Sequence, residues 1–185
     1  MIVLVGFMGA GKTTVGRLAA ERLGLPFIDT DELIEQRHGP IRRIFAERGE
    51  AAFREIEARV IAECLAGPDA VVALGGGAVE TPAVCDALQG HQVVWLRIGF
   101  DAALARVGGD PRRPVLADAG LRARFGLRQR RYAMVAKMTI DAVGSPKAVV
   151  ERLFEPPRRR RAPLARRYRV RAFGQRREPP KQRAR

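Results

Sequence analysis

A phosphate-binding loop motif near the N-terminus constrains this chain more than any other feature. Residues 6–13 read G-F-M-G-A-G-K-T, which is the pattern G-x-x-x-x-G-K-[ST]. A short apolar stretch, residues 2–5, precedes the motif, and a helix-forming segment, residues 14–23, follows it. The alternative is a glycine-rich turn that binds nothing, but such a turn needs neither the lysine nor the threonine. The motif therefore predicts a strand, loop and helix that together bind the phosphates of a nucleotide.

The residue types of the motif match the chemistry of a nucleoside triphosphate. Glycines let the backbone N–H groups turn inward around the phosphates, and the helix N-terminus adds donors and a favourable dipole. A lysine at this position reaches the terminal phosphates, and the hydroxyl after it ligates Mg²⁺. We expect a nucleoside triphosphate to contact Gly9, Ala10, Gly11, Lys12, Thr13 and Thr14.

The rest of the chain alternates between short apolar segments and amphipathic ones. This alternation predicts an α/β fold, a three-layer α/β/α sandwich with a five-stranded parallel sheet, as in P-loop NTPases. Ligands bind such sheets at the carboxyl ends of the strands. The expected strands are residues 2–5, 26–29, 71–74, 92–98 and 138–141, and the expected helices are residues 14–23, 31–37, 41–48, 51–66, 82–88, 102–106, 121–135 and 146–154.

The positive charge is concentrated at the C-terminal end. The chain has a formal net charge of +14, but residues 156–185 contain 13 Lys or Arg and one acidic residue, Glu178. Residues 1–155 therefore carry only +2. We expect one P-loop domain at residues 1–155 and a basic Arg/Pro-rich tail at residues 156–185, for which disorder is the default at such a composition. A tail of this kind can bind nucleic acid or another polyanion, although charge runs are more often solvated.

Several other classes of protein are disfavoured. No apolar run approaches the roughly 18 residues of a membrane span, and no signal peptide is evident. Cys64 and Cys85 form no C-x-x-C pair, and His38 and His91 lack metal-ligand spacing. We expect a monomeric, cytoplasmic protein with reduced cysteines and no membrane contact.

Two carboxylates follow the second expected strand, at Asp29 and Asp31. At i and i+2 on a strand tip they would point the same way, towards the phosphate loop. One can hold Mg²⁺ through water, while the other orients the hydroxyl of a phosphate acceptor. Asp31 has an alternative role as the cap of the following helix, whereas Asp29 has no comparable structural explanation.

Two further segments are candidates for the acceptor site. Arg54 and Glu57 are three residues apart, which fits either a surface ion pair worth about 0.2–0.5 kcal/mol or an arginine oriented by Glu57 to bind a substrate carboxylate. Gly75, Gly76 and Gly77 end the third expected strand. A plain turn needs only one or two glycines, so the triplet favours close approach of the backbone to a ligand.

A loop rich in glycine, proline and arginine interrupts the α/β pattern after residue 107. Its two adjacent arginines, Arg112 and Arg113, suggest a flap, about residues 108–120, that closes over phosphate. An ordinary solvated basic loop is the alternative. Arg128 lies in the next helix among several cations, and nothing local distinguishes it.

Taken in order, these elements resemble the shikimate kinase family, which belongs to the P-loop kinases similar to nucleoside monophosphate kinases. The resemblance covers about residues 2–154 and rests on residues 6–13, Asp29-Thr30-Asp31 with Ile34-Glu35, Gly49-Glu50, Phe53-Arg54 with Glu57, Gly75-Gly76-Gly77, Arg113-Pro114-Val115-Leu116, and the spacing of Arg128 and Tyr132. It implies ATP-dependent phosphorylation of the 3-hydroxyl of shikimate to 3-phosphoshikimate. A kinase for another small hydroxy acid, such as gluconate, is the alternative within this class.

The resemblance also implies roles for individual residues. Arg54 and Arg128 would bind the shikimate carboxylate, and Asp31 would lie near the attacking 3-hydroxyl. The implied catalytic residues are Lys12, Asp31 and Arg113, and Arg113 would close over the transferred phosphate. Arg106 would lie near adenine, and Mg²⁺ would be held by Thr13 and, through water, by Asp29. The substrate site would be completed by Glu57, Gly75, Gly76 and Gly77.

The chain departs from the family pattern in two places. Members usually have Ser or Thr before the helix that leads to the Gly-Glu pair, whereas here the segment reads His38-Gly39-Pro40-Ile41. We expect Gly39 to serve as N-cap with Pro40 at the first helical position. The basic tail is the second departure. A guanine-nucleotide switch is disfavoured, since no N-K-x-D motif is present.

Overall fold

A parallel β-sheet organises the part of the chain that the structure describes. The structure is a computed structural model and describes residues 1–107 and 120–155. Its strands lie in the order β2-β3-β1-β4-β5, and every pair is parallel. The strands are β1 (Ile2–Val5), β2 (Phe27–Asp29), β3 (Val71–Ala73), β4 (Gln92–Arg97) and β5 (Met138–Asp141). All five strands expected from the sequence are confirmed, with ends that differ by one residue at most.

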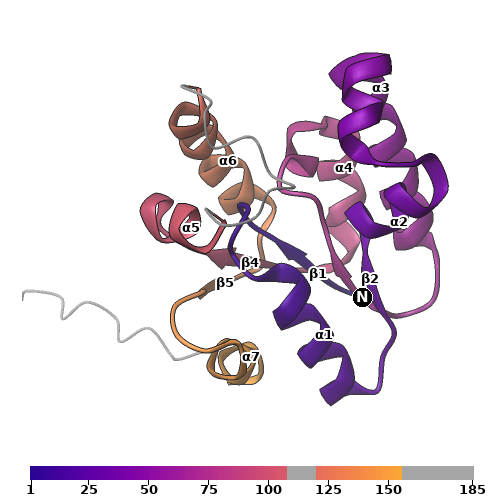
Figure 1. Ribbon diagram of the computed structural model, residues 1–185. Helices are drawn as coiled ribbons and strands as arrows, with labels where there is room; N and C mark the ends of the chain where they lie inside the picture. Colours follow the sequence, from indigo (N-terminus) through magenta and orange to yellow (C-terminus); the bar gives the residue numbers. More distant parts are fainter. Residues whose placement is uncertain (108–119, 156–185) are drawn as a thin grey trace, which may run out of the picture. The chain divides into compact units, whose positions relative to one another are not determined.

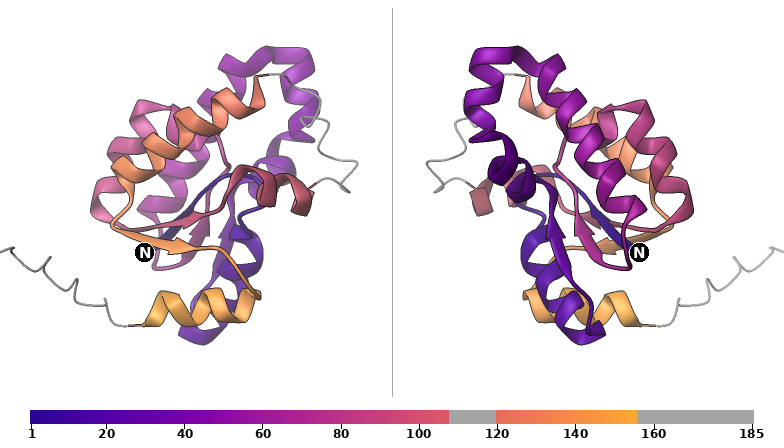
Figure 2. Two further views of the ribbon diagram at one scale, coloured as in Figure 1. Left: turned by 90° about the vertical axis from the view of Figure 1, so that its left-hand side faces the viewer. Right: turned by 90° about the vertical axis from the view of Figure 1, so that its right-hand side faces the viewer.

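Helices cover both faces of this sheet. Figure 1 and the two views in Figure 2 show α1 and α7 on one face and α3, α4 and α6 on the other, which confirms the three-layer α/β/α arrangement. None of the described helices is long and apolar enough to cross a membrane. The helical elements are α1 (Lys12–Leu23), α2 (Thr30–His38), α3 (Ile41–Ala66), η1 (Ala78–Glu80), α4 (Pro82–Ala87), η2 (Leu88–Gly90), α5 (Phe100–Val107), α6 (Leu121–Val135) and α7 (Pro146–Phe154).

The inner strands are apolar because helices bury both of their faces. Val3, Leu4, Val71, Val72 and Val94 are fully buried, which explains why these strands read as continuous apolar runs rather than alternating ones. Since all strands are parallel, their carboxyl ends lie along one edge of the sheet. The phosphate loop after β1 and the glycine triplet after β3 are therefore neighbours, because β1 pairs directly with β3.

A second, smaller apolar cluster lies between α2 and α3. It consists of Ile34, Ile44, Phe53, Ile56, Val60 and Cys64. Two separate helices were expected at residues 41–48 and 51–66, and the structure joins them into α3 with a break at Gly49, whose φ of 78° is a left-handed conformation. The break turns the first part of α3 so that Ile44 reaches the same cluster as Ile56 and Val60.

The expected cap at Gly39 is wrong. Gly39 ends α2 instead, with a φ of 85° and its N–H donating to the Glu35 carbonyl, and Pro40 is the N-cap of α3. Proline offers no side-chain acceptor for the unpaired N–H groups of the helix start. The carboxylate of Glu35 supplies one, since the N–H of Ile41 donates to Glu35 Oε1 at 3.1 Å. Glu35 thus supplies the acceptor that was expected from the segment around Gly39.

We predict that Glu35→Ala lowers the free energy of unfolding by about 0.5–1 kcal/mol, because α3 loses its N-terminal acceptor. Urea unfolding of the variant measures this loss. Gln36→Ala is the matched control, since Gln36 is exposed on the same helix and the acceptor for α3 is the neighbouring Glu35. Equal destabilisation by the two substitutions would contradict the capping role of Glu35.

Candidate active site

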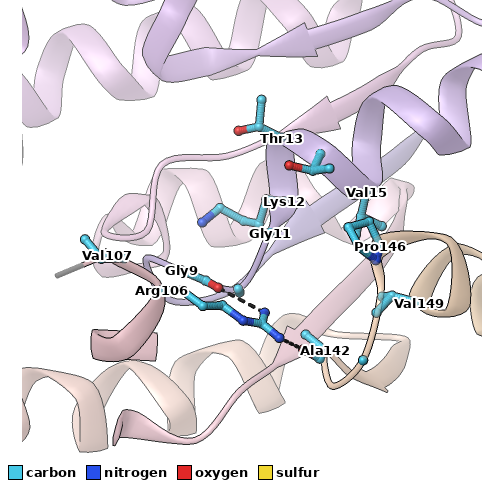
Figure 3. Close-up of a pocket in the computed structure, with 13 residues that line it drawn as sticks. Gly9, Gly11, Lys12, Thr13, Val15, Arg106, Val107, Ala142, Pro146 and Val149 are labelled. Carbon is cyan, nitrogen blue, oxygen red and sulfur yellow. Dashed lines mark hydrogen bonds between the residues drawn. The ribbon is translucent and has the colours of Figure 1, made fainter. Parts of the chain in front are cut away.

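The phosphate loop borders a pocket of about 400 Å³ at the carboxyl end of β1. All six residues predicted to contact ATP, Gly9 to Thr14, line it, and Figure 3 shows Lys12 and Thr13 on its wall. Gly9 and Gly11 have φ values of 76° and 85°, which only glycine adopts readily. A Cβ on Gly9 would lie 2.6 Å from the Ala103 carbonyl oxygen, so the loop packs closely against α5.

Arg106 lines the same pocket and connects two of its walls. Its Nη1 donates to the Gly9 carbonyl at 3.2 Å, and its Nη2 donates to the Ala142 carbonyl at 2.8 Å (Figure 3). Ala142 directly follows β5, so the guanidinium links the phosphate loop to the segment that leads to α7. Lys12 Nζ donates to the Gly6 carbonyl at 2.9 Å, which keeps its charge within the loop.

Asp29 connects the phosphate loop to the second strand. Its Oδ2 accepts a hydrogen bond from Thr13 Oγ1 at 2.6 Å. Its Oδ1 accepts from the backbone N–H groups of Asp31 and Glu32, which makes Asp29 the N-cap of α2. The expectation that Asp29 lacks a structural role is therefore wrong, and the cap is Asp29 rather than Asp31.

Asp31 faces a different partner from Asp29. Strand β2 ends at Asp29 and α2 begins at Thr30, so the two carboxylates do not share a strand tip and do not point the same way. The Asp31 carboxylate lies over the glycine triplet: a Cβ on Gly75 would be 2.6 Å from Asp31 Oδ1 and 2.7 Å from Glu57 Oε1. Asp31 and Glu57 therefore converge on Gly75.

Glu57 is the only buried charged side chain among the described residues, with 1% of it exposed. Its Oε2 accepts from Arg54 Nη1 at 2.7 Å. Burial raises the pKa of Glu57, and the charge of Arg54 opposes that shift only in part. Arg54 is itself only 18% exposed, so the Arg54–Glu57 pair is not the weak surface ion pair that was the alternative interpretation of their spacing.

Glu80 belongs to the same cluster but was not identified from the sequence. Its Oε2 accepts from Arg54 Nη2 and from Arg128 Nη2, both at 3.1 Å. Burial acts to raise the pKa of Glu80, but its hydrogen bonds with Arg128 and the charges of Arg128 and Arg54 outweigh burial and hold that pKa below its ordinary value. Arg54 and Arg128 come from α3 and α6, and Glu80 brings them together. No local pattern reveals this, because Glu80 is 26 residues from Arg54 and 48 from Arg128.

Two of the three glycines leave room for these charged side chains. A Cβ on Gly77 would be 2.5 Å from the Nη atoms of Arg54, and one on Gly75 would meet the two carboxylates described above. Gly76 has no neighbour closer than 3.6 Å to such a Cβ. The triplet therefore allows close approach of the chain's own site residues, whereas contact with a ligand stays a prediction.

Tyr132 ties α6 to the glycine triplet. Its hydroxyl donates to the Gly76 carbonyl at 2.5 Å, and its side chain is fully buried. Burial raises the pKa of Tyr132, so the group remains a neutral donor. Arg128 is one helical turn before Tyr132, so this bond also sets where Arg128 lies.

Some predicted elements cannot be placed in the site. Arg113, the flap except for Gly120, and the basic tail lie outside the described residues. Within residues 1–107 and 120–155, no group of three or more His, Cys, Asp or Glu side chains could hold a metal ion by itself.

The sheet order and the phosphate loop define a P-loop kinase fold, and a cluster of arginines and carboxylates adjoins the loop. Within that class, the chain belongs to the shikimate kinase family, whose sequence model matches residues 8–156. It is 45% identical over 155 residues to the shikimate kinase of Moorella thermoacetica, which covers 82% of this chain and 90% of that protein. It is 47% identical over 145 residues to the shikimate kinase of Thermobifida fusca, with 76% and 84% covered.

Solved structures agree with this assignment. Shikimate kinase from Acinetobacter baumannii in complex with shikimate has a TM-score of 0.78 and 37% identity, with 82% of this chain and 89% of that chain covered. A gluconokinase from Sinorhizobium meliloti has a TM-score of 0.51 and 21% identity, covering 81% and 86%, which shows a shared fold alone. The family expected from the sequence is thus confirmed.

We predict opposite pH dependences for substitutions at Glu57 and Glu80. The pKa of Glu57 is raised by folding, so its contribution to stability is full below the unfolded-state pKa of about 4.3 and is lost as pH rises through the folded-state value. The pKa of Glu80 is lowered, so its contribution is present above about pH 4.3 and is lost as pH falls through the folded-state value.

Urea unfolding of the wild type, Glu57→Gln and Glu80→Gln across acidic to neutral pH measures both effects. The stability advantage of the wild type over Glu57→Gln should shrink as pH rises, and its advantage over Glu80→Gln should grow. The groups that face Glu57 are Arg54, Asp31 and Arg128. Parallel pH profiles for the two variants would show that these carboxylates are not in different environments.

Proposed function

We propose that this chain transfers the terminal phosphoryl group of ATP to the 3-hydroxyl of shikimate, giving 3-phosphoshikimate and ADP. This is a step of chorismate and aromatic amino acid biosynthesis. Family membership supports the reaction, and one observation carries the acceptor assignment: Arg54 and Arg128 lie close enough to bridge a single carboxylate, that of Glu80. Shikimate offers one carboxylate and three hydroxyls to such a site.

The donor half of the reaction uses the phosphate loop. Backbone N–H groups from Gly9 to Thr14 and the N-terminus of α1 would hold the phosphates, and Lys12 would move from the Gly6 carbonyl to the transferred group. Arg106 would lie beside adenine, since it lines the same pocket as the phosphate loop. Arg113, from the flap, would close over the phosphate and keep water from the transfer.

The acceptor half uses residues around the glycine triplet. Asp31 would orient the 3-hydroxyl and accept its proton, and Gly76 would contact a hydroxyl through its backbone. Glu57 would act through Arg54, because its buried carboxylate fixes the guanidinium at 2.7 Å. The electrostatic field of Lys12, Arg113 and the loop would stabilise charge on the transferred group.

Mg²⁺ fits the residues at the start of α1 and the end of β2. Thr13 Oγ1 and Asp29 Oδ2 lie 2.6 Å apart, and both are oxygen donors of the kind that Mg²⁺ prefers. Thr13 would ligate the ion directly, and Asp29 would hold it through water. When bound, the ion neutralises charge on the phosphates. We further propose that the chain acts as a monomer in the cytoplasm, with Cys64 and Cys85 as free thiols.

A coupled assay of ADP release from Mg-ATP tests the proposed reaction. Purified full-length protein should release ADP when shikimate is added and should respond little to gluconate, because the paired arginines and the close-packed glycine triplet suit the compact ring of shikimate. ADP release that depends on gluconate but not on shikimate would favour the alternative substrate. Folded protein without any shikimate-dependent turnover would exclude the proposal.

We predict that Gly77→Ala raises the KM for shikimate about tenfold or more. The new Cβ would lie only 2.5 Å from the Arg54 Nη atoms and would therefore displace the guanidinium. Steady-state kinetics with varied shikimate measure this change. Gly90→Ala is the matched control, since a Cβ there has no neighbour within 4 Å. If both variants keep the wild-type KM, the position of Arg54 does not determine shikimate binding.

A further inference from the structure

The carboxylate of Glu80 lies between the two arginines that are proposed to bind the substrate carboxylate. Arg128 donates to both of its oxygens, from Nε to Oε1 at 3.3 Å and from Nη2 to Oε2 at 3.1 Å. Arg54 Nη2 donates to the same Oε2 at 3.1 Å. This is the forked geometry by which arginines recognise a carboxylate, here fulfilled by a side chain of the protein itself.

The two guanidinium groups are already surrounded by negative charge. Arg54 donates hydrogen bonds to Glu50, Glu57 and Glu80, and Arg128 donates to Glu80, so carboxylates of the chain already occupy both guanidinium groups. A substrate carboxylate that enters this cluster meets like charge at both arginines. It has to displace one of the three glutamates or bind against its repulsion.

The three glutamates differ in how easily they can be displaced. Glu57 is 1% exposed and packs beneath Arg54, so its carboxylate is fixed. Glu50 is 64% exposed, and of the two arginines it contacts Arg54, so its charge is largely screened by water. Glu80 is 26% exposed, contacts both arginines, and lies on the short turn η1 directly after the glycine triplet. Of the three glutamates, only Glu80 accepts hydrogen bonds from both guanidinium groups and is also partly exposed.

We propose that Glu80 is an internal stand-in for the substrate carboxylate, which holds Arg54 and Arg128 together in the empty site and must leave them when shikimate binds. Glu80 is thus a positioning residue that lowers affinity for the anionic acceptor. The inference rests on the proposed function, since it assumes that the same two arginines bind the substrate. The hydrogen bonds of Glu80 with both arginines have to be broken before the substrate carboxylate can form its own, and this cost lowers the affinity for the substrate.

Glu80→Gln tests this inference, because the amide keeps the shape of the side chain and removes its charge. The dissociation constant for shikimate, measured by titration calorimetry, should fall about fivefold or more. The methyl ester of shikimate, which has no charge to repel, should bind the variant and the wild type alike. A merely structural effect of the substitution would change both ligands together. Glu80→Ser loses the same charge and serves as a second variant, with the same expected outcome.

Glu63→Gln is the matched control. Glu63 forms a comparable ion pair with Arg37, at 2.6 Å, on the outer side of the α2–α3 pair, and it makes no contact with Arg54 or Arg128 among the described residues. The affinity of the Glu63→Gln variant for shikimate should equal that of the wild type. If Glu80→Gln binds shikimate no more tightly than the wild type, or if the ester gains equally, the inference is overturned. If the wild type neither binds nor phosphorylates shikimate, the proposed function fails first and the inference falls with it.

Discussion

The buried carboxylate of Glu57 is the constraint on which the proposed acceptor site depends. A charge that is 1% exposed needs a partner, and Arg54 supplies one from the same face of α3. The guanidinium can lie there only because Gly77 has no side chain, and Asp31 can approach Glu57 only because Gly75 has none. The glycine triplet, the arginine and the two carboxylates are thus one arrangement, in which no member can be enlarged without moving another.

The donor half is organised by backbone geometry instead. Gly9 and Gly11 adopt left-handed conformations, and α5 approaches the loop so closely that a side chain on Gly9 would collide with it. Asp29 joins the two halves, because one of its oxygens accepts from Thr13 on the phosphate loop and the other caps α2, which carries Asp31. The position of Asp31 is therefore set by the same residue that contacts the phosphate loop.

The sequence predicts the sheet, the phosphate loop and the family because each depends on local patterns. Apolar runs define the strands, and the spacing of Gly6 to Thr13 is a local geometric requirement. Roles that depend on tertiary contacts were missed or misassigned. Glu80 is far along the chain from both of its arginines, and the capping role of Glu35 appears only once Gly39 turns the chain back towards it. The capping role of Asp29 was missed because α2 begins at Thr30, one residue earlier than expected, which makes Asp29 the residue before the helix.

The small apolar cluster between α2 and α3 has a consequence for how such an enzyme can diversify. Ile34, Ile44, Phe53, Ile56, Val60 and Cys64 pack with one another rather than in the main core, and Ile28 is among the side chains that contact both clusters. The helices that carry Asp31, Arg54 and Glu57 therefore pack on an apolar cluster of their own. Mutations in this cluster can shift these three side chains while the packing beneath the phosphate loop stays intact. Acceptor preference and nucleotide use can therefore evolve separately in the proposed enzyme.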